Sequence, residues 1–232
     1  MTNPKGYIIY LPNHQDSVEW ANEALASGKA LGWDLELYEG IDGRTTDIAK
    51  HKLKFYTGSK KSRRLIERPG TLGCFLSQFS LWKKCAEQNI PICIFEHDVK
   101  FKKPFSVEKD FEDVLKFEGF KPAKKTPIGQ WWEGARAYYL KPSGATKIVQ
   151  WIIQNGAIPA DWELNSGILN VEFDNSPPTP IYKFPDPASI IRESPFVKCS
   201  ISKLSLSPNT AFALSLKYAV VPNPTVAPTP TN

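Results

Sequence analysis

Residues 70–98 read GTLGCFLSQFSLWKKCAEQNIPICIFEHD, and this stretch decides the fold. In residues 70–88, apolar side chains recur at steps of three and four, which predicts a helix with one apolar face. Asn89 and Pro91 end that helix. Residues 92–95 are continuously apolar, which is typical of a strand buried on both faces. Three polar residues, 96–98, then stand at the carboxyl end of this strand.

The sequence on both sides of this stretch alternates between strand patterns and helix patterns. The alternation indicates an α/β fold with a mostly parallel central sheet flanked by helices. In such sheets, ligands bind beyond the carboxyl ends of the strands. We expect strands at residues 7–11, 33–37, 137–140 and 171–173, and helices at residues 16–32, 106–115 and 142–156.

The length and the composition predict one domain and a short tail. The 232 residues are enough for an α/β domain with its own core, which we place at residues 1–220. Residues 221–232 are rich in Pro and Thr and lack aromatic and charged side chains, so we expect a disordered tail. No run of eighteen apolar residues occurs, and the N-terminus is too short and polar for a secretory signal. These features predict a cytoplasmic protein without a membrane span.

Charge and cysteine content leave several interpretations open. The net charge is +5, and residues 50–68 carry eight Lys and Arg side chains against one acid, Glu67. This segment is a nucleic-acid patch, an electrostatic funnel for a phosphorylated ligand, or a solvated loop. The four cysteines form no CxxC pair, which disfavours a structural zinc site. We expect them to be free, buried thiols in a reducing compartment.

Glu96 and Asp98 are the candidate metal ligands. If the extended geometry of the strand continues through them, their side chains point the same way and His97 points the other way. Two adjacent carboxylates repel one another, and a divalent cation removes that repulsion. Oxygen ligands suit Mg²⁺ or Mn²⁺, and such an ion can hold a diphosphate. The alternative is a solvated strand end, and for His97 we favour a structural role over that of a partner of the metal ligands.

Several of these segments together resemble glycosyltransferase family 25. The resemblance is carried by residues 70–82, GTLGCFLSQFSLW, and residues 92–99, ICIFEHDV. Residues 137–145, AYYLKPSGA, and 159–161, PAD, are similar to two further family segments, and residues 38–43, YEGIDG, match more loosely. The family includes lipooligosaccharide galactosyltransferases and collagen hydroxylysine galactosyltransferases. The similarity covers residues 5–170.

The resemblance implies a GT-A-type nucleotide-sugar fold and a metal-dependent, inverting transfer. The sugar, often galactose, would come from a UDP-sugar donor and pass to a glycan or other hydroxyl acceptor. An inverting transfer needs a general base beside the acceptor oxygen. Asp161 is the first candidate because it matches the family's Pro-x-Asp element, and Glu163 is the second because it follows two residues later. Arg136 is a candidate for contact with the diphosphate, with surface solvation as the alternative.

Trp131 and Trp132 stand next to Gly129 and Gln130 in a candidate sugar-stacking position. An aromatic pair of this kind more often belongs to a core or anchors a loop, so we rank the structural interpretation first.

Two residues depart from the family pattern and keep other functions open. Gln78 stands where the family usually has His, and His97 stands where it usually has a middle Asp. The second departure removes one carboxylate from the expected metal site. One alternative is therefore a nucleotide-sugar or glycan-binding protein whose catalytic site has decayed. The other is a metal-dependent nucleic-acid protein, which the basic segment 50–68 suggests.

Overall fold

A six-stranded sheet organises the computed structural model, which describes residues 3–107, 110–117, 122–126 and 128–174. The strands are β1 (Lys5–Tyr10), β2 (Leu35–Glu39), β3 (Ile92–Glu96), β4 (Val114–Lys116), β7 (Ala137–Leu140) and β8 (Val171–Phe173). They lie in the order β2-β1-β3-β7-β4-β8. A separate pair joins β5 (Lys124–Lys125) and β6 (Gln130–Trp131). The predicted tail, residues 221–232, lies outside the described residues.

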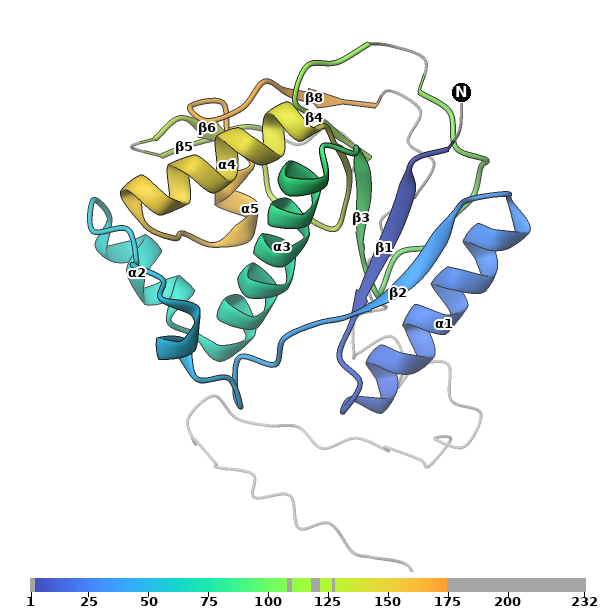
Figure 1. Ribbon diagram of the computed structural model, residues 1–232, viewed down its shortest axis with the longest axis horizontal. Helices are drawn as coiled ribbons and strands as arrows, with labels where there is room; N and C mark the ends of the chain where they lie inside the picture. The colour runs from blue at the N-terminus through green and yellow to red at the C-terminus, as the bar shows by residue number, and fades with distance from the viewer. Residues whose placement is uncertain (1–2, 108–109, 118–121, 127, 175–232) are drawn as a thin grey trace, which may run out of the picture. The chain divides into compact units, whose positions relative to one another are not determined.

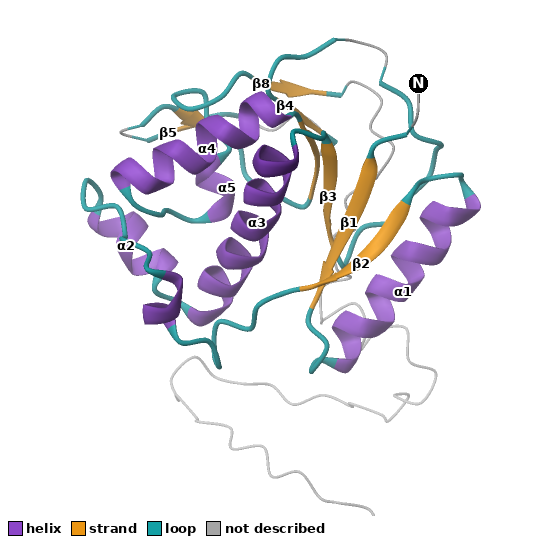
Figure 2. Ribbon diagram, viewed as in Figure 1, coloured by secondary structure: helices purple, strands orange, loops and turns teal. Residues whose placement is uncertain are grey.

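Helices cover both faces of the sheet (Figure 1). They are α1 (Gln15–Ala30), α2 (Lys60–Ile66), α3 (Pro69–Gln88), α4 (Pro142–Asn155) and α5 (Ala160–Glu163), with a 3-10 turn η1 (Ile48–His51). Figure 2 shows α1 on one face, and α3 with α4 on the other. Among the described residues, no helix combines the length and the apolar character needed to cross a membrane. The predicted α/β class is confirmed.

The sheet is mixed, which refines the prediction of a mostly parallel sheet. Strand β1 runs parallel to both β2 and β3, as expected. Strand β7 runs antiparallel to both of its neighbours, β3 and β4. An antiparallel neighbour needs no helical crossover. The chain accordingly passes from β3 through β4 to β7 without a helix among the described residues of that segment.

Strand β3 is buried on both faces, as its apolar run predicted. Ile92 and Ile94 face the cluster formed with α3 and α4, whereas Cys93 and Phe95 face the cluster formed with α1. Helix α3 contributes a continuous apolar face to the first cluster, beginning at Leu72. Pro69 stands at its first turn, where no amide hydrogen is needed, and Asn89 ends it in the left-handed conformation with φ 52°.

The helix predicted at residues 106–115 is wrong. Residues 114–116 form β4, which pairs with β7 and β8, and no described residue between 101 and 113 is helical. Phe111, Val114 and Leu115 are all buried, but they belong to clusters on opposite faces of the sheet. Spacing alone did not reveal this, because an apolar step of three or four residues also fits a short strand entered from a loop.

Candidate functional site

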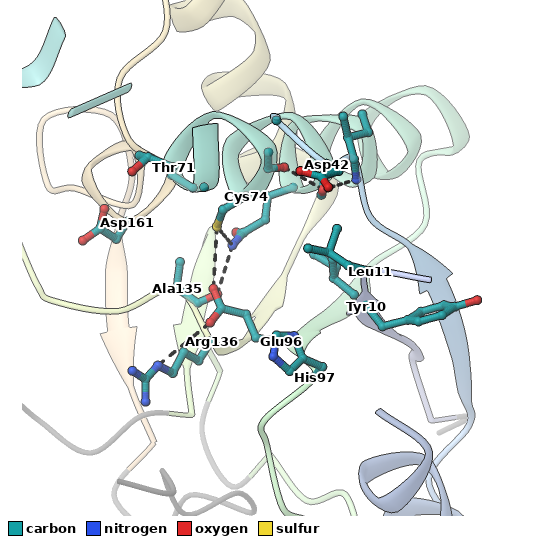
Figure 3. A pocket seen from close by; sticks show the side chains of 18 of the residues that line it. Tyr10, Leu11, Asp42, Thr71, Cys74, Glu96, His97, Ala135, Arg136 and Asp161 are labelled. Atoms are coloured by element: carbon teal, nitrogen blue, oxygen red, sulfur yellow. Dashed lines mark hydrogen bonds and ion pairs between the residues drawn. The ribbon is translucent and has the colours of Figure 1, made fainter. Parts of the chain in front are cut away.

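A cavity of about 1200 Å³ opens at the carboxyl ends of β1 and β3, where the sheet topology places ligand sites. Pockets for drug-sized ligands usually measure roughly 300–1,000 Å³. The cavity therefore has room for a nucleoside diphosphate together with a sugar. Figure 3 places Thr71 and Asp161 at one end and Leu11 and Asp42 at the other, with Glu96 between them.

Close packing between the loop after β2 and the first turns of α3 shapes one wall. A Cβ atom on Gly73 would lie 2.4 Å from the carbonyl oxygen of Ile41, and one on Gly43 would lie 1.9 Å from that of Pro69. Ser77 reinforces this contact, because its Oγ accepts a hydrogen bond from the Ile41 amide at 2.8 Å. Only glycine permits so close an approach of backbone to helix.

The amino-terminal end of α3 faces the cavity. Gly70 and Thr71 line it, and a Cβ atom on Gly70 would meet nothing within 4 Å. The first turn contains no acidic side chain. The unpaired amides and the positive end of the helix dipole therefore favour an anionic group at this wall.

The acidic turn after β3 differs from the extended geometry that the sequence suggested. The strand ends at Glu96, and residues 97–98 form a turn in which the Val99 amide donates to the Glu96 carbonyl at 3.3 Å. Glu96 and His97 line the cavity, whereas Asp98 does not. Glu96 contacts Cys74 of α3, whereas the His97 ring packs against Trp20 of α1 on the other face of the sheet, so the two side chains diverge as expected.

Both carboxylates nevertheless converge on one cation, the guanidinium of Arg136. Glu96 Oε2 lies 3.9 Å from Arg136 Nε, and Asp98 Oδ2 lies 3.9 Å from Arg136 Nη1. Figure 3 shows the Arg136 side chain beside Glu96, with a dashed line that marks their ion pair. The strand–turn geometry thus brings together three of the residues selected from the sequence.

The donor set fits a divalent ion that is shared with a substrate. Among the described residues, no group of three or more His, Cys, Asp and Glu side chains is placed to hold a metal. Within the same residues, Asp98 Oδ1 is buried and has no hydrogen-bond partner. Mg²⁺ is commonly held by one or two carboxylates together with substrate phosphates rather than by an all-protein cage. Glu96 and Asp98 are compatible with that arrangement.

His97 packs as the sequence interpretation favoured. Its ring stacks on Trp20 of α1, with centroids 5.5 Å apart and planes 11° from parallel. Burial lowers the pKa of the imidazole, so the ring is neutral at neutral pH. A neutral ring in place of a third carboxylate leaves the cavity wall less negative.

A buried hydrogen-bond chain supports the floor of the cavity. The indole of Trp82 donates to the Tyr138 hydroxyl at 2.7 Å, and that hydroxyl donates to the Gln78 side-chain oxygen at 2.7 Å. Gln78 is fully buried, and it takes the position where the family usually has His. Its amide oxygen accepts the hydrogen bond of the Tyr138 hydroxyl, which has no access to water.

The same chain continues from Gln78 to the acidic turn. The Gln78 amide nitrogen donates to the Ala135 carbonyl at 3.3 Å and to Cys74 Sγ at 3.5 Å. The Cys74 thiol in turn contacts Glu96 Oε1 at 3.7 Å. Burial, with the Glu96 charge as a second cause, raises the pKa of this thiol well above its usual value, so it acts as a donor and not as a thiolate. Cys74 and Gln78 are four residues apart on one face of α3, and this spacing was the signal in the sequence that their side chains meet.

Lys116 fixes the loop that carries Arg136. The side chain is fully buried in β4, and its ammonium donates to the carbonyls of Trp132, at 3.1 Å, and Gly134. Residues 133–136 line the cavity. Sequence reasoning missed this lysine, because a buried lysine inside a short strand has no distinctive pattern.

The two candidate bases occupy different environments. Asp161 lines the cavity, whereas Glu163 is fully buried and does not line it. Glu163 Oε1 accepts a hydrogen bond from the Ile158 amide at 3.0 Å, and burial raises its pKa well above the usual value. The structure thus brings Asp161, and not Glu163, to the candidate site.

The tryptophans take the structural role that we ranked first. Trp131 packs on Trp162 with ring centroids 5.3 Å apart, and Trp132 packs on Phe173 at 5.3 Å. Neither of the paired residues 131 and 132 lines the cavity.

The end of the cavity opposite Asp161 has an ion pair that the sequence interpretation did not identify. Asp42 accepts two hydrogen bonds from the Arg44 guanidinium, each 2.9 Å long, and both residues line the cavity. The hydrogen bonds from Arg44 hold the pKa of the Asp42 carboxyl below its usual value. The available signal was an Asp-Gly-Arg sequence directly after a predicted strand.

Comparison with known proteins connects this site to one family. A family model described as "Glycosyltransferase family 25 (LPS biosynthesis protein)" matches residues 3–125. The probable inactive glycosyltransferase 25 family member 3 of Rattus norvegicus is 33% identical over 96 residues, which cover 36% of this chain and 16% of that protein. The glycosyltransferase 25 family member of Aedes aegypti is 28% identical over 121 residues, covering 48% of this chain and 20% of that protein.

A third relative is the procollagen galactosyltransferase 1-A of Xenopus laevis, which is 29% identical over 103 residues. The match covers 41% of this chain and 16% of that protein. The chain therefore spans only a small part of the length of these relatives.

Proposed function

Because this chain belongs to glycosyltransferase family 25, we propose that it transfers a sugar from a nucleotide-sugar donor to a hydroxyl group of a glycan or other acceptor. The observation that carries the proposal is the cavity that Glu96, Arg136, Asp161 and the amino-terminal end of α3 share. Two carboxylates, a guanidinium and a helix amino terminus thus surround one space, which supports the proposal. UDP-galactose is the donor to test first, since one relative is named a galactosyltransferase.

In this proposal the donor diphosphate lies between the first turn of α3 and Arg136. Both groups are electropositive and both line the cavity. Glu96 and Asp98 would hold Mn²⁺ or Mg²⁺, which supplies positive charge for the leaving diphosphate. The nucleoside then extends toward Leu11 and Asp42 in a GT-A-like arrangement.

Asp161 acts as the general base in an inverting transfer. It accepts the proton of the acceptor hydroxyl while that oxygen forms a bond to the anomeric carbon, and the bond from that carbon to the diphosphate oxygen breaks. The nucleoside diphosphate leaves from the opposite side of the sugar. Arg136 offsets the negative charge that develops on it.

Asp161→Asn tests this assignment. We expect transfer and donor hydrolysis to fall by about 10²–10⁴-fold, because the variant cannot accept the proton, while UDP affinity stays within about twofold. The measurement is release of UDP from a panel of nucleotide sugars in the presence of Mn²⁺. Glu163→Gln is the matched control, since it removes a carboxylate two residues away that does not line the cavity. Full activity of Asp161→Asn would exclude the role.

The second candidate is a binding protein without turnover. His97 replaces a carboxylate that the family usually has, and two relatives bear names that call them inactive. Calorimetry with UDP and Mn²⁺ separates the two candidates when it is combined with the hydrolysis assay. Tight binding without hydrolysis of any donor in the panel would favour this second candidate.

A further inference from the structure

The basic segment of residues 50–68 has no role in the function proposed above. All eight of its Lys and Arg side chains are exposed. Their summed charge exceeds the net charge of +5 of the whole chain. Among the described residues, the ion pair in this segment joins Arg63 to the neighbouring Glu67 at 3.0 Å. So dense a group of exposed cations favours an anionic partner.

The segment packs against the part of the chain that carries the proposed base. The Tyr56 amide donates to the carbonyl of Ala157 at 3.1 Å. The ammonium of Lys61 lies 5.9 Å from the ring centre of Trp162, the residue after Asp161. The basic segment therefore packs beside the part of the chain that carries Asp161.

Helix α2 arranges the cations on its outer side. Ser62 and Ile66 are its buried residues, and Lys60 and Arg64 lie on the opposite side, four residues apart. Arg68 follows after another four residues and is the N-cap of α3. The next residues of the chain, 69–71, line the cavity. A row of positive charge thus leads from α2 to the rim of the site.

We propose that the basic surface formed by Lys60, Lys61, Arg64 and Arg68 binds an anionic group, a phosphate or a carboxylate, on the glycan acceptor. This inference rests on the proposed transferase function and adds the charge of the acceptor to it. Lys61 lies beside the residue that follows Asp161, so this surface adjoins the position proposed for the acceptor hydroxyl. Lysine and arginine bind both anions through charge-assisted hydrogen bonds.

A glycan fits this surface better than single-stranded nucleic acid does. Single-strand binding combines cations with exposed aromatic rings on which the bases stack. The rings beside this surface are engaged in packing: Tyr56 lies against Trp151 with centroids 5.6 Å apart, and Trp162 is only 8% exposed. Among the described residues, the basic surface therefore offers cations for an anionic group but no free aromatic ring on which a base could stack.

Calorimetry with three probes tests the inference. The probes are an oligomannoside bearing a phosphate monoester, the same oligomannoside after phosphatase treatment, and an oligogalacturonide of equal length. We expect the phosphorylated or the carboxylated probe to bind the wild-type chain at least about tenfold more tightly than the neutral one. The triple variant Lys60→Gln/Lys61→Gln/Arg64→Gln should lose that preference. Lys29→Gln/Lys83→Gln/Lys102→Gln removes the same charge from exposed positions elsewhere and should retain it.

Equal binding of the charged and neutral probes to the wild-type chain would overturn the inference, and this comparison does not depend on the folding of any variant. The inference would also be overturned if double-stranded DNA displaced the phosphorylated probe at a concentration of DNA phosphate below the concentration of probe phosphate. The surface would then bind nucleic acid. Donor hydrolysis separates the two proposals. Hydrolysis without a charge preference contradicts only the acceptor inference, whereas absence of hydrolysis with every donor contradicts the proposed transferase.

Discussion

Gln78 connects the buried core to the cavity through single hydrogen bonds. It accepts from Tyr138 and donates toward Ala135 and Cys74, and Cys74 contacts Glu96. An amide side chain both donates and accepts, as a neutral imidazole does. The replacement of the family's usual His by Gln therefore keeps a donor and an acceptor at this position.

Substitution of Gln78 by Leu should destabilise the chain and disturb donor binding together. The Tyr138 hydroxyl would lose its acceptor in a site without water, which costs about 1–3 kcal/mol. Urea unfolding and the KM for the donor measure the two effects. Gln78→His, which restores a donor and an acceptor, should lie closer to wild type in both. Wild-type stability of Gln78→Leu would contradict the role of this chain of hydrogen bonds.

Glu163 should make stability depend on pH. Burial raises its pKa in the folded chain, so the folded state holds a proton that the unfolded state releases above about pH 4.3. The stabilisation is complete below that unfolded pKa and declines as the pH rises toward the folded pKa. The decline should approach about 1.4 kcal/mol per pH unit.

Glu163→Gln removes the ionisation and should flatten this decline. We expect the variant to equal the wild type near pH 4 and to exceed it in free energy of unfolding at pH 7, as measured by urea unfolding at a series of pH values. Parallel curves for the two proteins would show that Glu163 does not carry the effect.

At the scale of elements, the position of the loop after β2 depends on its contact with α3. Gly43 and Gly73 allow the two backbones to approach, and Ser77 ties them together. Asp42 and Arg44 belong to this loop and line the cavity. The shape of the cavity beside Asp42 is therefore set by two glycines on different elements.

Gly73→Ala tests this contact, with Gly70→Ala as its control. A Cβ atom at position 73 would lie 2.4 Å from the Ile41 carbonyl oxygen, so the loop must move, at a cost of about 1–3 kcal/mol. At position 70 the added methyl group meets nothing within 4 Å, and replacement of a helical glycine should be neutral or stabilise by about 0.5–1 kcal/mol. Thermal unfolding of both variants decides this, and equal destabilisation of the two would contradict the packing argument.

At the scale of the whole molecule, the sequence predicted the elements with strong periodicity and missed those that depend on pairing. The apolar run of β3 and the stepped apolar face of α3 both appear in the structure where they were expected. Strand β4 was read as helix, because its three residues owe their conformation to hydrogen bonds with β7 and β8. Short strands carry too little periodicity to reveal such partners.

The site was predictable where a residue ends a strand or belongs to a family segment. Glu96 ends β3 and Asp161 belongs to a family segment, and both line the cavity. The turn at residues 97–98 was not predictable, since it depends on a hydrogen bond between Val99 and Glu96. Lys116 was missed because its role arises from contacts with a loop distant in the chain, whereas the Arg44–Asp42 pair is local and the Asp-Gly-Arg sequence offered a signal for it.

The most direct test of the account is the affinity for UDP measured by calorimetry in Mn²⁺ and in EDTA. We expect Mn²⁺ to tighten binding at least about tenfold in the wild-type chain, and Asp98→Asn to abolish that gain while it leaves the affinity in EDTA unchanged. Glu96→Gln should behave in the same way. Equal affinity of the wild-type chain for UDP with and without Mn²⁺ would contradict the claim that these two carboxylates share a metal ion with the donor diphosphate.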